Sequence, residues 1–250
     1  MSIELTGLRK AFGSRVILDG ITLDVQEGET LAVIGQSGAG KSVLLKTIVG
    51  LLEPDEGTVL VDEQIVAQLP REELYELRRK VGYVFQFAAL FDSMSVFDNV
   101  AMGLRRIQTM TEVEIEQRVH DSLRRVDMDG FADRLPGQLS GGQRKRVGFA
   151  RAIATRPKYL LYDEPTTGLD PVTTAVIDEL ILRMARELSV TGIVVTHDMK
   201  SAFRVAQRIA MLYQGKIRFV GTPHEMEASR DPIVRGFVEG RPDLMNEVAA

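Results

Sequence analysis

The N-terminal part of the chain alternates hydrophobic and polar residues with a period of two, which is typical of half-buried antiparallel strands. The alternation covers Ile3–Leu8 and Val16–Val25, which are separated by a Gly-Ser turn, and a further strand is expected at Thr58–Val61. Between them, the apolar run Leu31–Ile34 predicts a buried strand, and a glycine-rich loop and a helix follow it. The pattern therefore predicts an antiparallel sheet beside a strand-loop-helix unit.

Helical periodicity replaces this pattern from Phe87 to about Ala154. Residues Thr111–Glu114 form a capping-box sequence at the start of an amphipathic helix that is expected to run to about Asp127. A second helix is expected over Arg144–Ala154. This block is predicted to be a helical insertion between two halves of an α/β core.

Short apolar runs return after the insertion. They are Tyr159–Tyr162, Gly192–Thr196 and Ile209–Tyr213, with a helical pattern over Val172–Leu188 after the first. This alternation predicts parallel β-α-β units, whose right-handed crossovers bring the strand ends beside the glycine-rich loop. A last capping box, Thr222–Glu225, opens a C-terminal extension.

The glycine-rich loop carries the first candidate chemistry. Residues 35–42 fit the pattern G-x-x-x-x-G-K-[ST] in the strand-loop-helix context that a phosphate-binding loop requires. Backbone N–H groups and the helix N-terminus favour a polyphosphate there. Lys41 would add charge for the outer phosphates, and the Ser42 hydroxyl is suited to ligate Mg²⁺. The alternative, a simple connecting turn, gives no reason for Lys and Ser after the last glycine. The expected nucleotide-binding residues of the loop are Gly35, Ser37, Gly38, Gly40, Lys41 and Ser42.

Two carboxylates end the strand at 159–162. Asp163 is suited to hold Mg²⁺ through its water shell, and Glu164 to orient a water that attacks the γ-phosphate. The alternative is a solvated acidic turn. A phosphate loop needs an acidic Mg²⁺ partner, which favours the catalytic interpretation.

The sequence Leu-Ser-Gly-Gly-Gln at 139–143 has two compatible interpretations. Ser140 and Gln143 match a capping box, whereas Gly141 and Gly142 cost helix stability and open backbone N–H groups to a large anion.

Single aromatic and histidine residues remain ambiguous from sequence. Phe12 is either a core residue at a strand edge or a platform for a base, and His197 is either structural or a hydrogen-bond donor beside a γ-phosphate. His120 and His224 fall on predicted helix surfaces and receive no role.

The amino-acid composition limits the class of protein and the partners and compartment that are compatible with it. Of 250 residues, 44% are hydrophobic and 26% are charged, which is typical of a globular protein, and the net charge of −4 argues against nucleic acid as a partner. The sequence has no cysteine, which excludes a disulfide or a thiolate metal site. This lack of cysteine is compatible with a reducing cytosol. No apolar run approaches the roughly 18 residues of a membrane-spanning helix, and no secretory signal is recognised.

Together these motifs resemble the ATP-binding subunit of ABC transporters over about residues 3–220, because the 139–143 signature lies between the phosphate loop and Asp163-Glu164. The resemblance implies an α/β fold with a phosphate-loop NTPase (RecA-like) core, an N-terminal antiparallel β subdomain and an inserted α-helical signature subdomain. We expect one nucleotide-binding domain over 1–220, with its core at 1–86 and 155–220, its helical subdomain at 87–154, and an extension at 221–250.

The resemblance also assigns roles by motif. Phe12 would stack on adenine, where the family often has Tyr, and Gln86 would sense Mg²⁺ and the attacking water. Glu164 would be the catalytic base and His197 the switch histidine, and Asp170 would belong to a loop, 168–170, that reaches across a dimer.

In the family's mechanism, each ATP is bound between two subunits. Ser140 and Gly142 of one subunit would clamp the γ-phosphate that Lys41 of the other holds, with Gly141 and Gln143 completing the signature. This chain carries both halves, so the resemblance implies a homodimer with two Mg-ATP sites.

A narrower resemblance concerns the Mla-type ATPases, which energise phospholipid transport in Gram-negative envelopes. It lies at 89–100 and 231–240. It implies a membrane permease that docks near Leu90–Val100, an MCE-domain lipid-binding protein, sometimes a STAS-domain regulator, and a place on the cytoplasmic face of the inner membrane. For docking, the candidate apolar residues, which could instead form the subdomain core, are Leu90, Phe91, Met94 and Phe97. For the extension, the residues expected to dock on the partner subunit are Ile233, Val234 and Phe237.

Three other functions stay open at this stage. The chain could serve an ABC importer for another small solute, since such importers share a similar stretch after Gln86. It could be a soluble ABC ATPase that acts on nucleic acid. It could also be a phosphate-loop kinase, which would have no use for the signature sequence.

Overall fold

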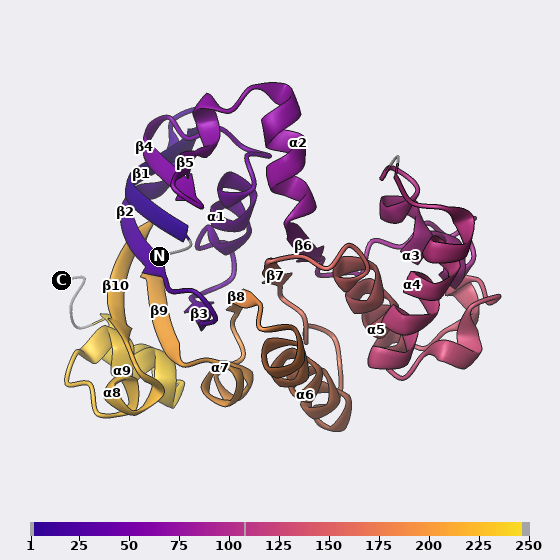
Figure 1. Cartoon of the computed structure of the whole chain (residues 1–250). Helices are drawn as coiled ribbons and strands as arrows, with labels where there is room; N and C mark the ends of the chain where they lie inside the picture. The colour runs from indigo at the N-terminus through magenta and orange to yellow at the C-terminus, as the bar shows by residue number, and fades with distance from the viewer. Residues whose placement is uncertain (1–2, 108, 247–250) are drawn as a thin grey trace.

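The computed structural model describes residues 3–107 and 109–246 of the chain, which form two sheets and three groups of helices (Figure 1). The predicted fold class, an α/β core with an added antiparallel sheet and helical insertion, is confirmed. None of the helices within these residues is both long and apolar enough to cross a bilayer.

The smaller sheet is antiparallel, with the strand order β2-β1-β4-β5. Its strands are β1 (Ile3–Phe12), β2 (Arg15–Val25), β4 (Glu56–Val61) and β5 (Gln64–Ile65). Alternate residues of β1 and β2 are buried against α1 (Lys41–Ile48) and the larger sheet, which is the physical origin of the period of two in the sequence.

The larger sheet has the order β10-β9-β3-β8-β7-β6, and every pair except β9-β10 is parallel. Its strands are β3 (Thr30–Ile34), β6 (Val81–Val84), β7 (Tyr159–Asp163), β8 (Thr191–Thr196), β9 (Arg208–Tyr213) and β10 (Lys216–Gly221). Strands β3, β7 and β8 are buried along their whole length, as expected for parallel strands that helices cover on both faces. Because these strands are neighbours, the loops after them meet at one edge of the sheet.

Helices cover both sheets and form the insertion, which lies to the right of the core in Figure 1. The insertion contains α3 (Val96–Leu104), α4 (Glu112–Arg125) and α5 (Gly141–Ile153). Around the core lie α1, α2 (Arg71–Arg79), α6 (Pro171–Leu188) and α7 (Met199–Val205), and the C-terminal part contains α8 (Pro223–Glu227), α9 (Pro232–Glu239) and α10 (Pro242–Asn246).

All three predicted capping boxes, with N-caps Thr111, Ser140 and Thr222, are present. The start predicted for one helix, Arg144, is three residues late, because α5 begins at Gly141. Its Ser140 cap fixes the first turn despite two glycines, since the Gln143 side chain accepts from the Ser140 N–H at 2.8 Å.

The prediction that the extension docks on a partner through Ile233 and Val234 is wrong for these two residues. They are 2% and 0% exposed and pack in their own chain against Ile34 and Met211, with Phe237 partly buried on the same cluster. An amphipathic helix signals that one face is buried, but its sequence does not say against which surface. Residues 247–250 of the extension lie outside the described part.

A buried carboxylate in α6 yields a stability prediction. Asp178 is 4% exposed, its Oδ2 accepts from Ser201 at 3.1 Å, and its Oδ1 has no partner within the described part of the chain. Burial, and to a lesser extent the charge of Asp198, raises the pKa of Asp178 above its ordinary value of 3.8. The stability that its protonated form contributes is thus present at low pH and is lost as the pH rises through the raised pKa.

An Asp178→Asn variant should therefore raise the free energy of unfolding by about 1 kcal/mol at pH 7 and flatten its decline between pH 4 and pH 7. Urea unfolding at several pH values measures both effects. Glu179→Gln, which changes an exposed acid on the same helix, is the matched control. Equal pH slopes for Asp178→Asn and the wild type would contradict this account.

Candidate functional site

The phosphate loop joins β3 to α1 and depends on two close backbone approaches. A Cβ on Gly35 would lie 2.4 Å from the carbonyl oxygen of Leu212. Gly40, which precedes the first residue of α1, has φ of +105°, and a Cβ there would lie 2.9 Å from Ile17 Cγ2. Side chains are therefore excluded at both positions, and the loop is fixed at the N-terminus of α1, where the helix dipole favours an anion.

Lys41 is the buried cation of this loop, with 5% of its side chain exposed. Its Nζ donates to the carbonyl oxygens of Gly35 at 2.8 Å and Gln36 at 3.1 Å, and lies 3.2 Å from Oε1 of Glu164. The predicted cation and the predicted base thus meet as an ion pair inside the site. A buried positive charge in this position is suited to phosphate oxygens.

Asp163 ends β7 opposite the start of α1. Its Oδ1 accepts from Ser42 Oγ at 2.7 Å and its Oδ2 from the Tyr83 hydroxyl at 3.0 Å. Burial, reinforced by the Asp163 charge, raises the pKa of Tyr83, so this hydroxyl remains a donor. The two predicted Mg²⁺ residues, Ser42 and Asp163, are therefore brought together.

Glu164 follows directly and turns the chain out of the sheet. It is a non-glycine residue with φ of +49°, and its N–H donates to the Val195 carbonyl at 2.9 Å. Its Oε2 accepts from Thr167 Oγ1 at 3.1 Å and lies 2.8 Å from Nδ1 of His197. A left-handed backbone at such a position costs energy and is found most often at functional sites. The loops after β7 and β8 thus bring together the predicted base and the predicted switch histidine.

These groups line a cleft of about 400 Å³. Its lining residues are Phe12, Arg15, Ile17, Ser37, Gly38, Gly40, Lys41, Ser42, Val43, Gln86 and Glu164. Phe12 is 50% exposed at the end of β1, with Lys10 Nζ 5.7 Å from its ring centroid, so it is no core residue and its ring is available for stacking. The cleft thus combines an exposed aromatic ring with the buried cation of the phosphate loop, Lys41, as a nucleoside polyphosphate requires.

The signature sequence lies outside this cleft. Ser140 and Gly141 are exposed at the start of α5, and a Cβ on Gly142 would lie 2.7 Å from Thr173 Cγ2 of α6. Asp170 caps that same helix by accepting from the N–H groups of Val172 and Thr173 at 3.0 Å each. The signature and the 168–170 loop therefore sit side by side, and neither is part of the lining of their own chain's cleft.

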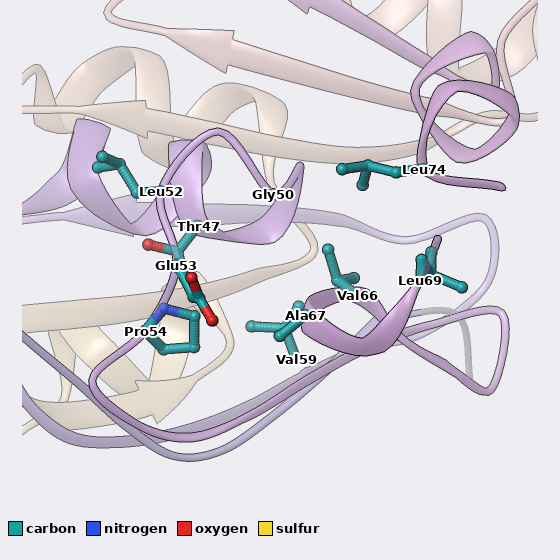
Figure 2. A pocket seen from close by; sticks show the side chains of 10 residues that line it. All are labelled: Thr47, Gly50, Leu52, Glu53, Pro54, Val59, Val66, Ala67, Leu69 and Leu74. Atoms are coloured by element: carbon teal, nitrogen blue, oxygen red, sulfur yellow. The ribbon is translucent and has the colours of Figure 1, made fainter. Parts of the chain in front are cut away.

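Another pocket has a different chemistry (Figure 2). It holds about 160 Å³ between the end of α1, β4 and α2, and Glu53 is the one charged residue among those that line it. Its walls are Thr47, Gly50, Leu52, Glu53, Pro54, Val59, Val66, Ala67, Leu69 and Leu74. Without a cation this pocket does not fit a polyphosphate, unlike the cleft at the phosphate loop, which Lys41 lines.

Within the described residues, no group of three or more His, Cys, Asp or Glu side chains could hold a metal ion by itself. The oxygen donors of Ser42 and Asp163 nevertheless suit Mg²⁺, which in such sites takes one or two protein ligands together with substrate phosphates and water. The donor set therefore fits Mg²⁺ that arrives with a nucleotide.

Several residues of the site escaped the sequence analysis. Tyr83 and Thr167 hold the two carboxylates, and no local pattern distinguishes them from ordinary strand and turn residues. Arg15 lines the cleft at the start of β2. Lys145 of α5 is 5% exposed, and burial lowers its pKa to about 8, although the charges of Glu164 and Asp163 oppose this shift.

Residues 18–167 match the family model described as ABC transporter. The fold agrees, since the chain superposes with a TM-score of 0.81 and 34% identity on the dimeric post-hydrolysis structure of the ATP-binding cassette MJ0796 bound to ADP and Pi, over 88% of this chain and 98% of that one. It likewise resembles cbiO1 of Clostridium perfringens, with a TM-score of 0.84 and 30% identity over 99% and 98% of the two chains.

Curated relatives extend over almost the whole chain. The probable ribonucleotide transport ATP-binding protein mkl of Mycobacterium leprae is 40% identical over 96% of this chain and 70% of its own length. A sulfate/thiosulfate import ATP-binding protein of Chromobacterium violaceum is 44% identical over 95% of this chain and 66% of its own length.

The chain therefore belongs to the ABC transporter family. It is the ATP-binding subunit of such a transporter, an ATPase whose hydrolysis is coupled to transport. Subunits of this kind act as dimers together with membrane permeases.

Proposed function

We propose that this subunit forms a homodimer that powers Mla-type phospholipid transport through a partner permease. The single observation that carries the substrate is the segment 89–100, which resembles the Mla-type ATPases and forms a loop that leads into the first residues of α3. Asn99, with 0% exposure, holds that loop: its amide donates to the carbonyls of Phe91, Met94 and Ser95, and its Oδ1 accepts from the Phe91 N–H at 2.8 Å.

The loop would be part of the permease-docking surface. Of the four predicted residues, Phe91 is 50% exposed, Met94 is half-buried, and Leu90 and Phe97 pack against the subdomain core. Phe87, which was not predicted, is 81% exposed beside them in the chain. A cleft of about 660 Å³ between α2, β6 and the insertion opens nearby, with Tyr75, Phe85 and Arg151 among its walls. Exposed aromatic residues beside a cleft are typical of a protein-binding surface.

The roles of the site residues are proposals that the geometry supports. Lys41 would hold the β- and γ-phosphates, Phe12 would stack on adenine, and Ser42, Asp163 and Gln86 would hold Mg²⁺. When bound, Mg²⁺ would neutralise charge that develops on the phosphates. Glu164, oriented by Thr167 and His197, would accept a proton from water as the water oxygen bonds to the γ-phosphorus and the bond to ADP breaks.

Closure of the site would require a second copy of the chain. Ser140, Gly142 and Asp170 lie together on one surface outside the chain's own cleft, so in a homodimer they would face the partner's γ-phosphate. The cassette MJ0796 was solved as a dimer, which supports this arrangement. We also propose an MCE-domain protein and a STAS-domain regulator as partners, and a place on the cytoplasmic face of the inner membrane.

A second candidate substrate is a small solute such as an anion. The 44% identity to a sulfate/thiosulfate import protein favours it, because that relative also matches over 95% of this chain. The ATPase mechanism would be the same, since substrate choice would belong to the permease.

Affinity purification separates the two substrates. The tagged full chain is isolated from its host's membranes in mild detergent, and the proteins and lipids that come with it are identified by mass spectrometry. Recovery of a permease with an MCE-domain protein and phospholipid is the expected result. Recovery of a different permease with a soluble solute-binding protein would contradict phospholipid as the substrate and would support the solute importer.

A further inference from the structure

Helix α5 holds two loops of the nucleotide cleft as well as carrying the signature sequence. Lys145, in its second turn, is almost fully buried. Its Nζ donates to the carbonyl oxygen of Gln86 and, at 3.3 Å, to that of Glu164. One ammonium thus bonds to the backbone of the proposed Mg²⁺-sensing glutamine and of the proposed base, two residues that are 78 positions apart in the sequence.

A second cation, further along α5, also holds the loop that follows Gln86. Arg151 donates to the carbonyl oxygens of Ala88 and Ala89, at 2.6 Å each. These consecutive non-glycine residues have φ of +59° and +47°, a conformation that surrounding contacts must stabilise. Gly148 lies between the two cations, and a Cβ on it would lie 3.3 Å from Ala88 Cβ, so α5 and the loop are in close contact.

The hydrogen-bond partners of Lys145 differ from those of most buried lysines. A buried lysine is usually paired with a carboxylate, which offsets the cost of removing its charge from water. Lys145 bonds instead to carbonyl groups of two separate loops, and it is absent from the lining of the cleft. Its ammonium therefore holds the backbone from which the Gln86 and Glu164 side chains project.

We propose that Lys145 is a positioning residue that connects the signature helix to both catalytic loops of its own chain. When the N-terminal end of α5 engages the nucleotide of the partner subunit, the Lys145 contacts would bring Gln86 and Glu164 into register for hydrolysis. This inference rests on the proposed dimeric ATPase and names a residue that neither the motifs nor the family match assign.

The test compares binding with catalysis in the full chain. Lys145→Met keeps an unbranched apolar stem that reaches as far as Cε but removes the Nζ donor. We expect its kcat to fall about 100-fold, the effect of misplacing catalytic groups by about 1 Å, with the Kd for ATP unchanged. Lys216→Met, which removes an exposed lysine paired with Asp19 at 3.3 Å, is the matched control and should retain the wild-type kcat. An unchanged kcat, or a loss of ATP binding in Lys145→Met, would overturn the proposal.

Chemical rescue separates positioning from a folding defect. The chain contains no cysteine, so Lys145→Cys introduces a single reactive thiol. Alkylation of the unfolded variant with 2-bromoethylamine, followed by refolding, creates an ammonium side chain of nearly the same length, whereas bromoethane creates an apolar one. Recovery of kcat with the amine alone supports the proposal, and equal recovery with both reagents overturns it. If the wild-type chain itself showed no ATP hydrolysis, the proposed function would fail instead.

Discussion

A Glu164→Gln variant should bind ATP, lose hydrolysis and accumulate as an ATP-bound dimer. The amide keeps the shape of the side chain and its contacts with Thr167 and His197, but it can no longer accept a proton from the attacking water. General-base catalysis of this kind contributes about 10²- to 10⁴-fold, so we expect kcat to fall on the order of 10³-fold. In the proposed homodimer, hydrolysis would reopen the closed state, so its loss should leave that state populated.

Two measurements check this expectation. Phosphate release gives the rate, and size-exclusion chromatography with and without ATP gives the fraction of dimer. Glu187→Gln is the matched control, because it changes an exposed glutamate that pairs with Arg125 at 2.6 Å and is not among the residues that line the cleft. Hydrolysis by Glu164→Gln at the wild-type rate would contradict the assignment of the base.

A Lys41→Ala variant should lose ATP binding itself. Its ammonium is the buried cation of the phosphate loop, and the loss of a charged hydrogen bond to phosphate costs about 3 kcal/mol, or on the order of 100-fold in the Kd for ATP. The same change removes the ammonium that lies 3.2 Å from Glu164 Oε1 and leaves this carboxylate buried without it. The free energy of unfolding should therefore also fall.

Lys46→Ala is the matched control for this second prediction. Lys46 lies on the same helix, α1, but is exposed. Titration with a fluorescent ATP analogue measures the Kd. Urea unfolding of each variant gives its stability, and hence the fraction that is folded in the absence of urea. Wild-type affinity in folded Lys41→Ala would show that the phosphates bind elsewhere.

The sequence predicted the parts of the site that depend on local chain geometry. A phosphate loop needs glycine where Leu212 and Ile17 approach its backbone, and a capping box needs fixed spacing, so both are visible in a short window. The carboxylates Asp163 and Glu164 were equally clear because they end an apolar strand. These features are local consequences of backbone sterics and hydrogen bonding.

The rest depends on contacts between distant segments. Tyr83 binds Asp163 across the pair β6-β7, and Lys145 reaches loops that precede and follow it in the chain. No fixed spacing of residue types in the sequence marks either of these contacts. For the same reason the apolar residues Ile233 and Val234 were assigned to a partner surface, whereas they pack on their own sheet. The sequence left two interpretations of Phe12 open, and only the exposure of its side chain in the structure distinguished a platform for a base from a core residue.

The central claim, that each ATP site is completed by a second copy of the chain, is tested most directly by complementation. Lys41→Ala and Ser140→Arg chains with different tags are co-expressed, and the mixed dimer is isolated through both tags. Each variant should be inactive alone. In the mixed dimer, one site combines both substitutions and the other has neither, so we expect about half of the wild-type ATPase rate per dimer, as one of two equivalent sites is intact. An inactive mixed dimer that still binds ATP would contradict the account, since it would place Ser140 and Lys41 in the same chain's site.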